Sequence, residues 1–198
     1  SQLCIAATLW MVWRTGRRML DRQRALIGTV LTMGVTYYSF PTIEFNHNIA
    51  QMPLWAALVY AFLAALQDGK LWQWAVLGVL AGLAMLTKYP MAIVLLTCGL
   101  YLLLSKPRRA LLWSAGPWLA LGLLVVVFAP HLLWLQATDG LPFAYASERA
   151  LAQSGNPRLQ ALAFPFTQLL THLPLLLALV WAMWRTRHVS VKDGQVFR

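Results

Sequence analysis

The sequence predicts an all-α membrane protein, a polytopic bundle of transmembrane helices. Its 198 residues are 60% hydrophobic and only 11% charged, whereas a soluble domain carries about 25% charged residues. Mean hydropathy is +0.61, and the apolar residues come in long runs instead of alternating with polar ones. Such runs fit helices, which pair every backbone group internally, better than the short alternating strands of a membrane barrel.

The apolar runs predict the individual helices. The first run, at residues 2–13, is shorter than the roughly 20 residues that cross a bilayer. We therefore expect it to be the end of a truncated span that begins before Ser1, which would make the chain an internal fragment. Six later runs are expected to be full spans, at about 26–40, 49–66, 71–87, 89–104, 111–135 and 159–184.

The segment at 136–158 is too long for a simple turn, and its Ser147-Glu148-Arg149 stretch predicts a short surface helix.

The net charge of +10 is mainly a signal of topology. Alternate connections hold all but three of the 16 basic residues, and the other connections hold only Lys88, Arg149 and Arg158. Basic residues favour the cytoplasmic side. We therefore expect the C-terminal tail in the cytoplasm and we do not expect nucleic-acid binding. The basic residues assigned to the cytoplasmic side are Arg14, Arg17, Arg18, Arg22, Arg24, Lys70, Lys106, Arg108, Arg109, Arg185, Arg187, Lys192 and Arg198.

Gly78 and Gly82 have the Gly-xxx-Gly spacing that lets two membrane helices approach closely. We interpret this pair as a helix-packing surface and not as part of a site.

A polar cluster lies at 44–48, on the face expected to be outward. Glu44, Asn46, His47 and Asn48 would offer carboxylate, amide and imidazole groups to one site, and such groups near hydrocarbon often mark function. The alternative is a polar turn in which Asn46 or Asn48 caps the next helix. Glu44 and His47 could also hold a divalent metal, although two ligands alone are a weak signal.

Lys88 and Tyr89 lie at the next outward connection. A lone lysine on this face could hold a phosphate as a compact point charge. It could equally anchor a helix end by extending its ammonium to the interface.

The long outer segment supplies two further candidates. Asp139 is a possible base, but Asp139-Gly140 is also a turn signal. His131, beside Pro130, could belong to a site or could be a hydrogen-bonded structural residue.

Motifs of soluble enzymes are not found, including phosphate-binding glycine loops, nucleophile elbows and zinc signatures. The acidic residues lie in connections and not deep in the apolar runs, unlike those of ion-coupled transporters. This distribution favours chemistry or binding at the outer membrane surface over conduction through the membrane.

Four segments, in this order, resemble bacterial multi-pass glycosyltransferases of family 39, the relatives of protein O-mannosyltransferases and of the lipid A aminoarabinose transferase. The segments are Phe45-Asn-His-Asn-Ile-Ala-Gln-Met-Pro-Leu-Trp55, Gly78-Val-Leu-Ala-Gly-Leu-Ala-Met-Leu-Thr-Lys-Tyr89, Pro130-His-Leu-Leu-Trp-Leu and Leu141-Pro-Phe-Ala-Tyr145. The resemblance extends from about residue 14 to 184.

The resemblance implies a C-type glycosyltransferase fold in the bacterial cytoplasmic membrane. Such enzymes use a polyprenyl-phosphate sugar donor at the outer face, where an acidic residue of the first outer loop receives the acceptor proton. The resemblance places Lys88 at the donor phosphate and Tyr89 near the donor or the acceptor. Glu44, Asn46, His47 and Asn48 would line the same cavity, and we include His131 and Asp139 among the substrate-binding residues.

On this interpretation, residues 1–184 are part of one glycosyltransferase domain and 185–198 are a basic cytoplasmic tail. The catalytic carboxylate would lie upstream of Ser1, so the fragment alone would be inactive. Membrane lipid and the polyprenyl-phosphate donor are the expected partners, with no cofactor identified beyond a possible divalent metal. The alternatives are a transporter or flippase module for a lipid-linked or anionic substrate, and a non-catalytic assembly subunit.

Overall fold

The described part of the chain is helical. The computed structural model describes residues 1–35, 45–152 and 157–186, and within these ranges no strand forms. The helices are α1 (Gln2–Arg17), α2 (Arg22–Met33), α4 (His47–Asp68), α5 (Leu71–Thr87), α6 (Met91–Leu104), the short 3₁₀-helix η2 (Arg109–Trp113), α7 (Ala115–Ala137), α8 (Leu141–Ala152) and α9 (Pro157–Thr186). The all-α prediction is confirmed for these ranges, and the expected tail at 185–198 lies almost entirely outside them.

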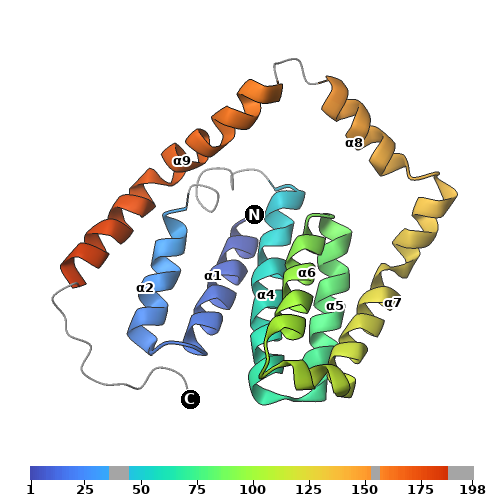
Figure 1. Ribbon diagram of the computed structural model, residues 1–198, viewed down its shortest axis with the longest axis horizontal. Coiled ribbons are helices and arrows are strands. Elements are labelled where there is room, and N and C mark those ends of the chain that lie inside the picture. The colour runs from blue at the N-terminus through green and yellow to red at the C-terminus, as the bar shows by residue number, and fades with distance from the viewer. Residues whose placement is uncertain (36–44, 153–156, 187–198) are drawn as a thin grey trace.

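Helices α1, α4, α5 and α6 form a bundle, and α7 packs against α5 before it leaves the bundle (Figure 1). Helix α2 lies beside α1, while α8 and α9 form an arch that extends away from the bundle. Buried residues of α4, α5, α6 and α7 make one apolar core, in which Leu58, Ala65 and Ala84 are fully buried. The short surface helix expected in the segment at 136–158 is present as α8.

Two helices, α4 and α7, are long and apolar enough to cross a membrane. Helix α9 is also long and apolar enough if its two halves are taken together as one span. Its halves, Ala161–Leu173 and Leu175–Trp181, are bent by 63° at the position of Pro174, because proline cannot donate to the helical ladder. Helices α5 and α6 are apolar but have only 17 and 14 residues.

Six full spans are therefore not shown by the structure. At about 1.5 Å per residue, a helix of the length of α6 covers roughly 21 Å of a hydrocarbon core about 30 Å thick. The expected span at 26–40 is described only in part, because α2 ends at Met33 and residues 36–44 lie outside the described ranges. The spans other than α4, α7 and α9 stay predictions.

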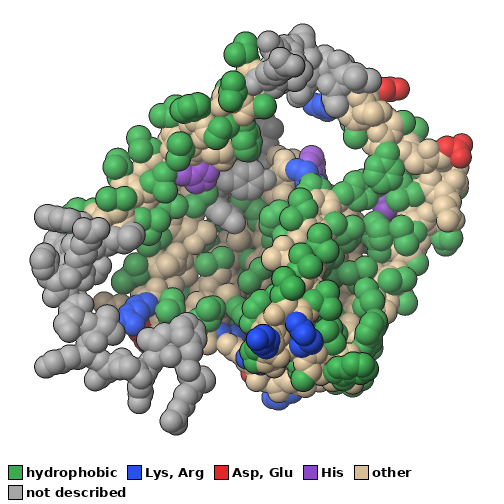
Figure 2. Space-filling view, viewed as in Figure 1, with side chains coloured by type: hydrophobic (Ala, Val, Ile, Leu, Met, Phe, Trp, Pro, Cys, Tyr) green, Lys and Arg blue, Asp and Glu red, His purple; other side chains and the backbone are tan. Residues whose placement is uncertain are grey.

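Helices α7 and α9 expose large apolar side chains. Val126 and Leu133 on α7 are each 67% exposed, and Leu170 on α9 is 70% exposed. Figure 2 shows hydrophobic side chains spread over the whole of the face in view. Soluble proteins rarely expose apolar surface of this extent, so the exposed side chains support an integral membrane protein.

Close contact between α5 and α7 confirms the packing interpretation of Gly78 and Gly82. A Cβ at Gly78 would overlap the Ala120 carbonyl and lie 2.8 Å from the Ala120 Cα. A Cβ at Gly82 would lie 2.5 Å from the Cβ of Val127. Only glycine lets the two backbones approach this closely.

The basic connections meet at one end of the bundle, which we call the basic end; Figure 2 shows the Lys and Arg side chains there. The Arg18 guanidinium joins α1 to α4 through two hydrogen bonds of 3.1 Å to the Asp68 carboxylate. It also lies 5.0 Å above the centre of the Tyr60 ring. Arg108 donates to the Leu66 carbonyl at 2.7 Å and so connects the α6–η2 turn to α4.

Replacing Gly78 tests the α5–α7 contact. We expect Gly78→Ala to destabilise the protein by about 1–3 kcal/mol, because the added methyl group must separate the two backbones. Gly122→Ala on α7 is the matched control, because a Cβ there meets nothing within 4 Å; it should stabilise the helix by about 0.5–1 kcal/mol. Thermal unfolding in detergent measures both, and equal melting temperatures would contradict the close contact.

Candidate functional site

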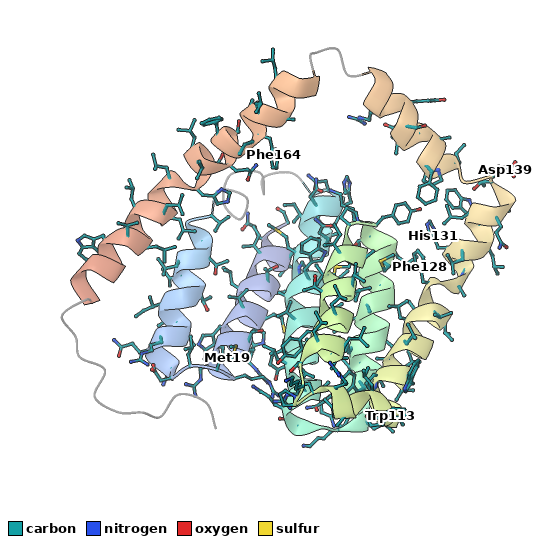
Figure 3. All side chains as sticks on the ribbon, in the orientation of Figure 1. Met19, Trp113, Phe128, His131, Asp139 and Phe164 are labelled. Carbon is teal, nitrogen blue, oxygen red and sulfur yellow. The ribbon has the colours of Figure 1, made fainter. Side chains whose placement is uncertain are left out.

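The polar residues singled out in the sequence lie at the end of the bundle opposite the basic end. This site end is formed by the N-terminus of α4, the α5–α6 connection, the last turns of α7 and the start of α8 (Figures 1 and 3). Segments that are 40 or more residues apart in the sequence are thereby brought together.

Asn46 caps α4. Its backbone is extended, with φ −145° and ψ 176°, and its Oδ1 atom accepts hydrogen bonds from the backbone N–H groups of Asn48 at 2.9 Å and Ile49 at 3.3 Å. The capping interpretation is therefore confirmed for Asn46, because the first N–H groups of a helix lack the carbonyl four residues earlier that later N–H groups bind. His47 follows as the first residue of α4 and is exposed. Glu44 lies outside the described residues.

Lys88 is held against α4 by Asn48. Helix α5 ends at Thr87, and Lys88 has an extended backbone, as expected so close to the proline at 90, which cannot continue a helix. The Lys88 Nζ donates a hydrogen bond of 2.7 Å to the Asn48 Oδ1, and both residues are half-buried. An ammonium can donate three hydrogen bonds, and one of them goes to Asn48 among the described residues. The charge is thus positioned by a neutral partner.

Tyr89 joins the α5–α6 connection to α7. Its hydroxyl lies 2.7 Å from the Nε2 of His131, and the tautomer of the imidazole decides which of the two donates. The Tyr89 ring also stacks on Phe143 of α8, with centroids 5.6 Å apart and planes inclined by 14°. His131 is therefore a hydrogen-bonded residue within an aromatic cluster, and Figure 3 shows it on the side of α7 that faces the bundle.

Asp139 forms the turn between α7 and α8. Its φ of 48° and the φ of 71° at Gly140 are both left-handed, a conformation open mainly to Gly, Asn and Asp. The side chain is exposed, and Figure 3 places it at the corner between the two helices. The turn prediction is confirmed, and the structure does not bring this carboxylate to Lys88.

A metal centre is not evident within the described ranges. No group of three or more His, Cys, Asp or Glu side chains in them could hold an ion. Of the suggested pair of Glu44 and His47, Glu44 lies outside these ranges.

Sequence reasoning missed several members of the site end. Phe128 and Trp134 each contact the His131 ring, at centroid distances of 5.1 and 5.3 Å. The spacing of three residues on either side of His131 could have indicated one aromatic helix face. Gln51, which is 7% exposed, lies one turn below Asn48, and its buried Oε1 atom has no partner among the described residues.

Comparison with known protein families now identifies the class. Residues 1–134 match the family described as dolichyl-phosphate-mannose-protein mannosyltransferase. The match covers more than half of the chain and includes α1 to most of α7, with Asn48, Lys88 and His131. The chain belongs to this family of membrane glycosyltransferases, which use a sugar linked to a lipid phosphate. No curated protein and no solved structure gave a significant match.

Replacing Asn46 tests its role as the cap of α4. We expect Asn46→Ala to lower the stability of the protein by about 1 kcal/mol, and Asn46→Asp to retain most of it, because aspartate is an equally good cap. Thermal unfolding of the two variants in detergent measures the difference. If Asn46→Ala unfolds at the wild-type temperature, the two hydrogen bonds to α4 do not contribute to stability.

Proposed function

We propose that the protein transfers a sugar from a polyprenyl-phosphate donor to an acceptor hydroxyl, with Lys88 holding the donor phosphate. The observation that carries this proposal is the hydrogen bond of 2.7 Å from the Lys88 Nζ to the Asn48 Oδ1. It positions the ammonium at the site end of a domain whose family uses such donors. Because Asn48 is neutral, it orients the cation without cancelling its charge.

The reaction explains why a cation is needed at this point. The acceptor oxygen forms a bond to the anomeric carbon while the bond from that carbon to the phosphate oxygen breaks. The electron pair of the broken bond goes to the phosphate, whose negative charge grows in the transition state. A prepositioned ammonium stabilises that charge more than it stabilises the intact donor. The acceptor proton goes to a carboxylate, which we do not assign to a residue of this chain.

Residues around Lys88 are proposed to line the donor and acceptor site. Tyr89 adjoins Lys88 in sequence and its ring stacks on Phe143, so it can form one wall beside the leaving phosphate. His131 would orient the Tyr89 hydroxyl through their 2.7 Å contact. His47 is exposed at the entrance, and we retain Glu44 as a lining residue from its position in the sequence.

We propose further that the site end faces outward from the cytoplasmic membrane of a bacterium. The last turn of α1 and the connections that follow α1 and α6 form the basic end, and they carry Arg14, Arg17, Arg18, Lys106 and Arg109. Connections rich in Lys and Arg favour the cytoplasmic side. The donor and acceptor would then meet at the outer surface.

Loss of the Lys88 charge should reduce transfer. In the full-length gene product, we expect Lys88→Ala to lower kcat/KM by about 100-fold or more, the range seen when one group that stabilises transition-state charge is removed. Polyprenyl-phosphate mannose serves as the probe donor, and release of polyprenyl phosphate is measured. Lys88→Arg should retain part of the activity.

Lys70→Ala is the matched control, because it removes a lysine at the basic end that makes no side-chain cap contact with α5. Normal turnover is expected from this variant. Equal activities of Lys88→Ala and Lys70→Ala would remove Lys88 from the site. Equal membrane insertion of the two variants must accompany the comparison.

The orientation can be tested with single cysteines after Cys4 and Cys98 are replaced by serine. Asp139→Cys places a thiol on the exposed α7–α8 turn, and Arg22→Cys places one at the exposed start of α2. In spheroplasts, a membrane-impermeant maleimide should label Asp139→Cys and leave Arg22→Cys unlabelled until the membrane is opened. The reverse pattern would place the site end in the cytoplasm.

A further inference from the structure

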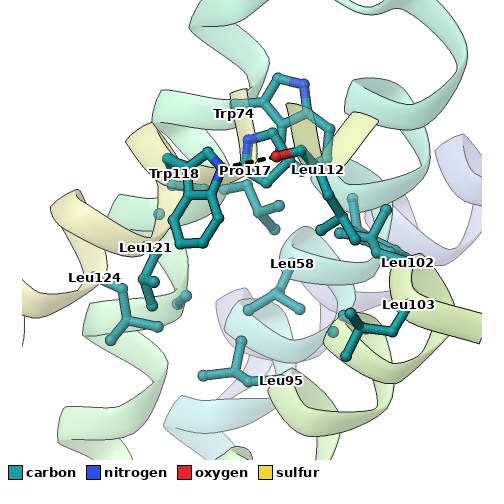
Figure 4. Close-up of a pocket in the computed structure, with 17 residues that line it drawn as sticks. Leu58, Trp74, Leu95, Leu102, Leu103, Leu112, Pro117, Trp118, Leu121 and Leu124 are labelled. Atoms are coloured by element: carbon teal, nitrogen blue, oxygen red, sulfur yellow. Dashed lines mark hydrogen bonds between the residues drawn. The ribbon is translucent and has the colours of Figure 1, made fainter. Parts of the chain in front are cut away.

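An apolar cavity of about 350 Å³, partly open at the surface, lies between the helices of the bundle (Figure 4). It is bounded by α4, α5, α6, η2 and α7, and the proposed reaction does not use it. Its lining includes Leu58 of α4, Leu95 and Leu102 of α6, and Leu121 of α7. The cavity is partly open, since its lining residues Leu103 and Leu121 are exposed; its apolar walls offer water few hydrogen-bond partners, and the unfilled space leaves lining atoms without packing partners.

The cavity adjoins the basic end. Leu103 is one of its lining residues, and the carbonyl of Leu103 accepts a hydrogen bond of 2.8 Å from the Nε of Arg109. The Arg109 side chain is therefore attached to the wall of the cavity, and its charge is otherwise exposed. Lys106, three residues from Leu103, is exposed in the same connection. The connection that follows α6 thus carries two cations next to a wall of the cavity.

Two tryptophans place this region at the level of lipid headgroups. The Trp118 Nε1 donates a hydrogen bond of 2.8 Å to the Leu112 carbonyl, and both residues line the cavity. Trp118 is 61% exposed and Trp113 is 92% exposed. Exposed indoles of membrane proteins concentrate where hydrocarbon meets headgroups. A lipid could therefore bring its phosphate to Lys106 and Arg109 while its chain lies deeper.

We infer that the cavity binds one acyl chain of an anionic phospholipid whose headgroup is held by Lys106 and Arg109. The apolar walls match the chain, and the two cations match a negative headgroup. The headgroup position at Lys106 and Arg109 follows the C-terminal end of α6, whereas Lys88 precedes its N-terminal end, so the headgroup would bind apart from the proposed donor phosphate. The bound lipid would fill the space between α6 and α7 and so support the position of α7.

Lipid binding tests this inference in the full-length protein. Delipidated protein in detergent is mixed with phosphatidylglycerol or with phosphatidylcholine of the same acyl chains. Native mass spectrometry then measures the bound fraction, and thermal unfolding measures stability. We expect phosphatidylglycerol to bind more tightly and to raise Tm by several degrees.

Paired variants test separately the binding of the headgroup and the binding of the acyl chain. Lys106→Gln with Arg109→Gln should weaken phosphatidylglycerol binding by about fivefold for each cation removed. Arg17→Gln with Arg22→Gln removes the same charge from exposed positions of α1 and α2 and should leave binding unchanged. Gly99→Leu should fill the cavity and abolish binding, because a Cβ at this lining position meets nothing within 4 Å. Gly122→Leu, at an equally open position outside the lining, should retain binding.

Three outcomes would overturn the inference. Equal affinity for phosphatidylglycerol and phosphatidylcholine would exclude recognition of the anionic headgroup. Undiminished binding to Gly99→Leu would place the lipid elsewhere. Displacement of the phospholipid by polyprenyl phosphate, in a Lys88→Ala background, would show that the cavity belongs to the donor chain instead.

Discussion

The direct contact of the α5 and α7 backbones at Gly78 and Gly82 is the constraint on which the rest of the structure depends. In hydrocarbon, helices gain little from burying apolar side chains, so close packing and dispersion must hold them together. A side chain at either glycine would push α7 away from α5. Since α7 carries both His131 and one wall of the apolar cavity, this single contact supports the two ends of the bundle.

The two ends use polar groups differently. At the basic end, the Arg18 guanidinium is neutralised by the Asp68 carboxylate, which makes a structural connection between α1 and α4. At the site end, the Lys88 ammonium is held by an amide oxygen and keeps its net charge. A paired cation stabilises the bundle, whereas a cation with a neutral partner remains available to an anionic ligand.

Local patterns in the sequence predicted much of the fold. Apolar runs predicted the helices, the spacing of Gly78 and Gly82 predicted a packing surface, and Asp139-Gly140 predicted a turn. Span number was less accessible, because α6 is apolar along its whole length yet short. The pairing of Lys88 with Asn48 could not be derived from spacing, since it depends on how α4 packs beside α5 across 40 residues of sequence. The sequence did identify both residues as candidates, and the structure shows that they meet.

The turn at Asp139 and Gly140 has a further consequence for the arch formed by α8 and α9. Two successive left-handed residues set the angle at which the chain leaves α7, and the Phe143 ring then comes to rest on Tyr89. The direction of α8 is thus encoded by two backbone conformations and one ring contact, and not by a broad interface. Substitutions on the exposed surface of α8 can therefore leave its direction unchanged, provided that the turn and the contact between Phe143 and Tyr89 are kept.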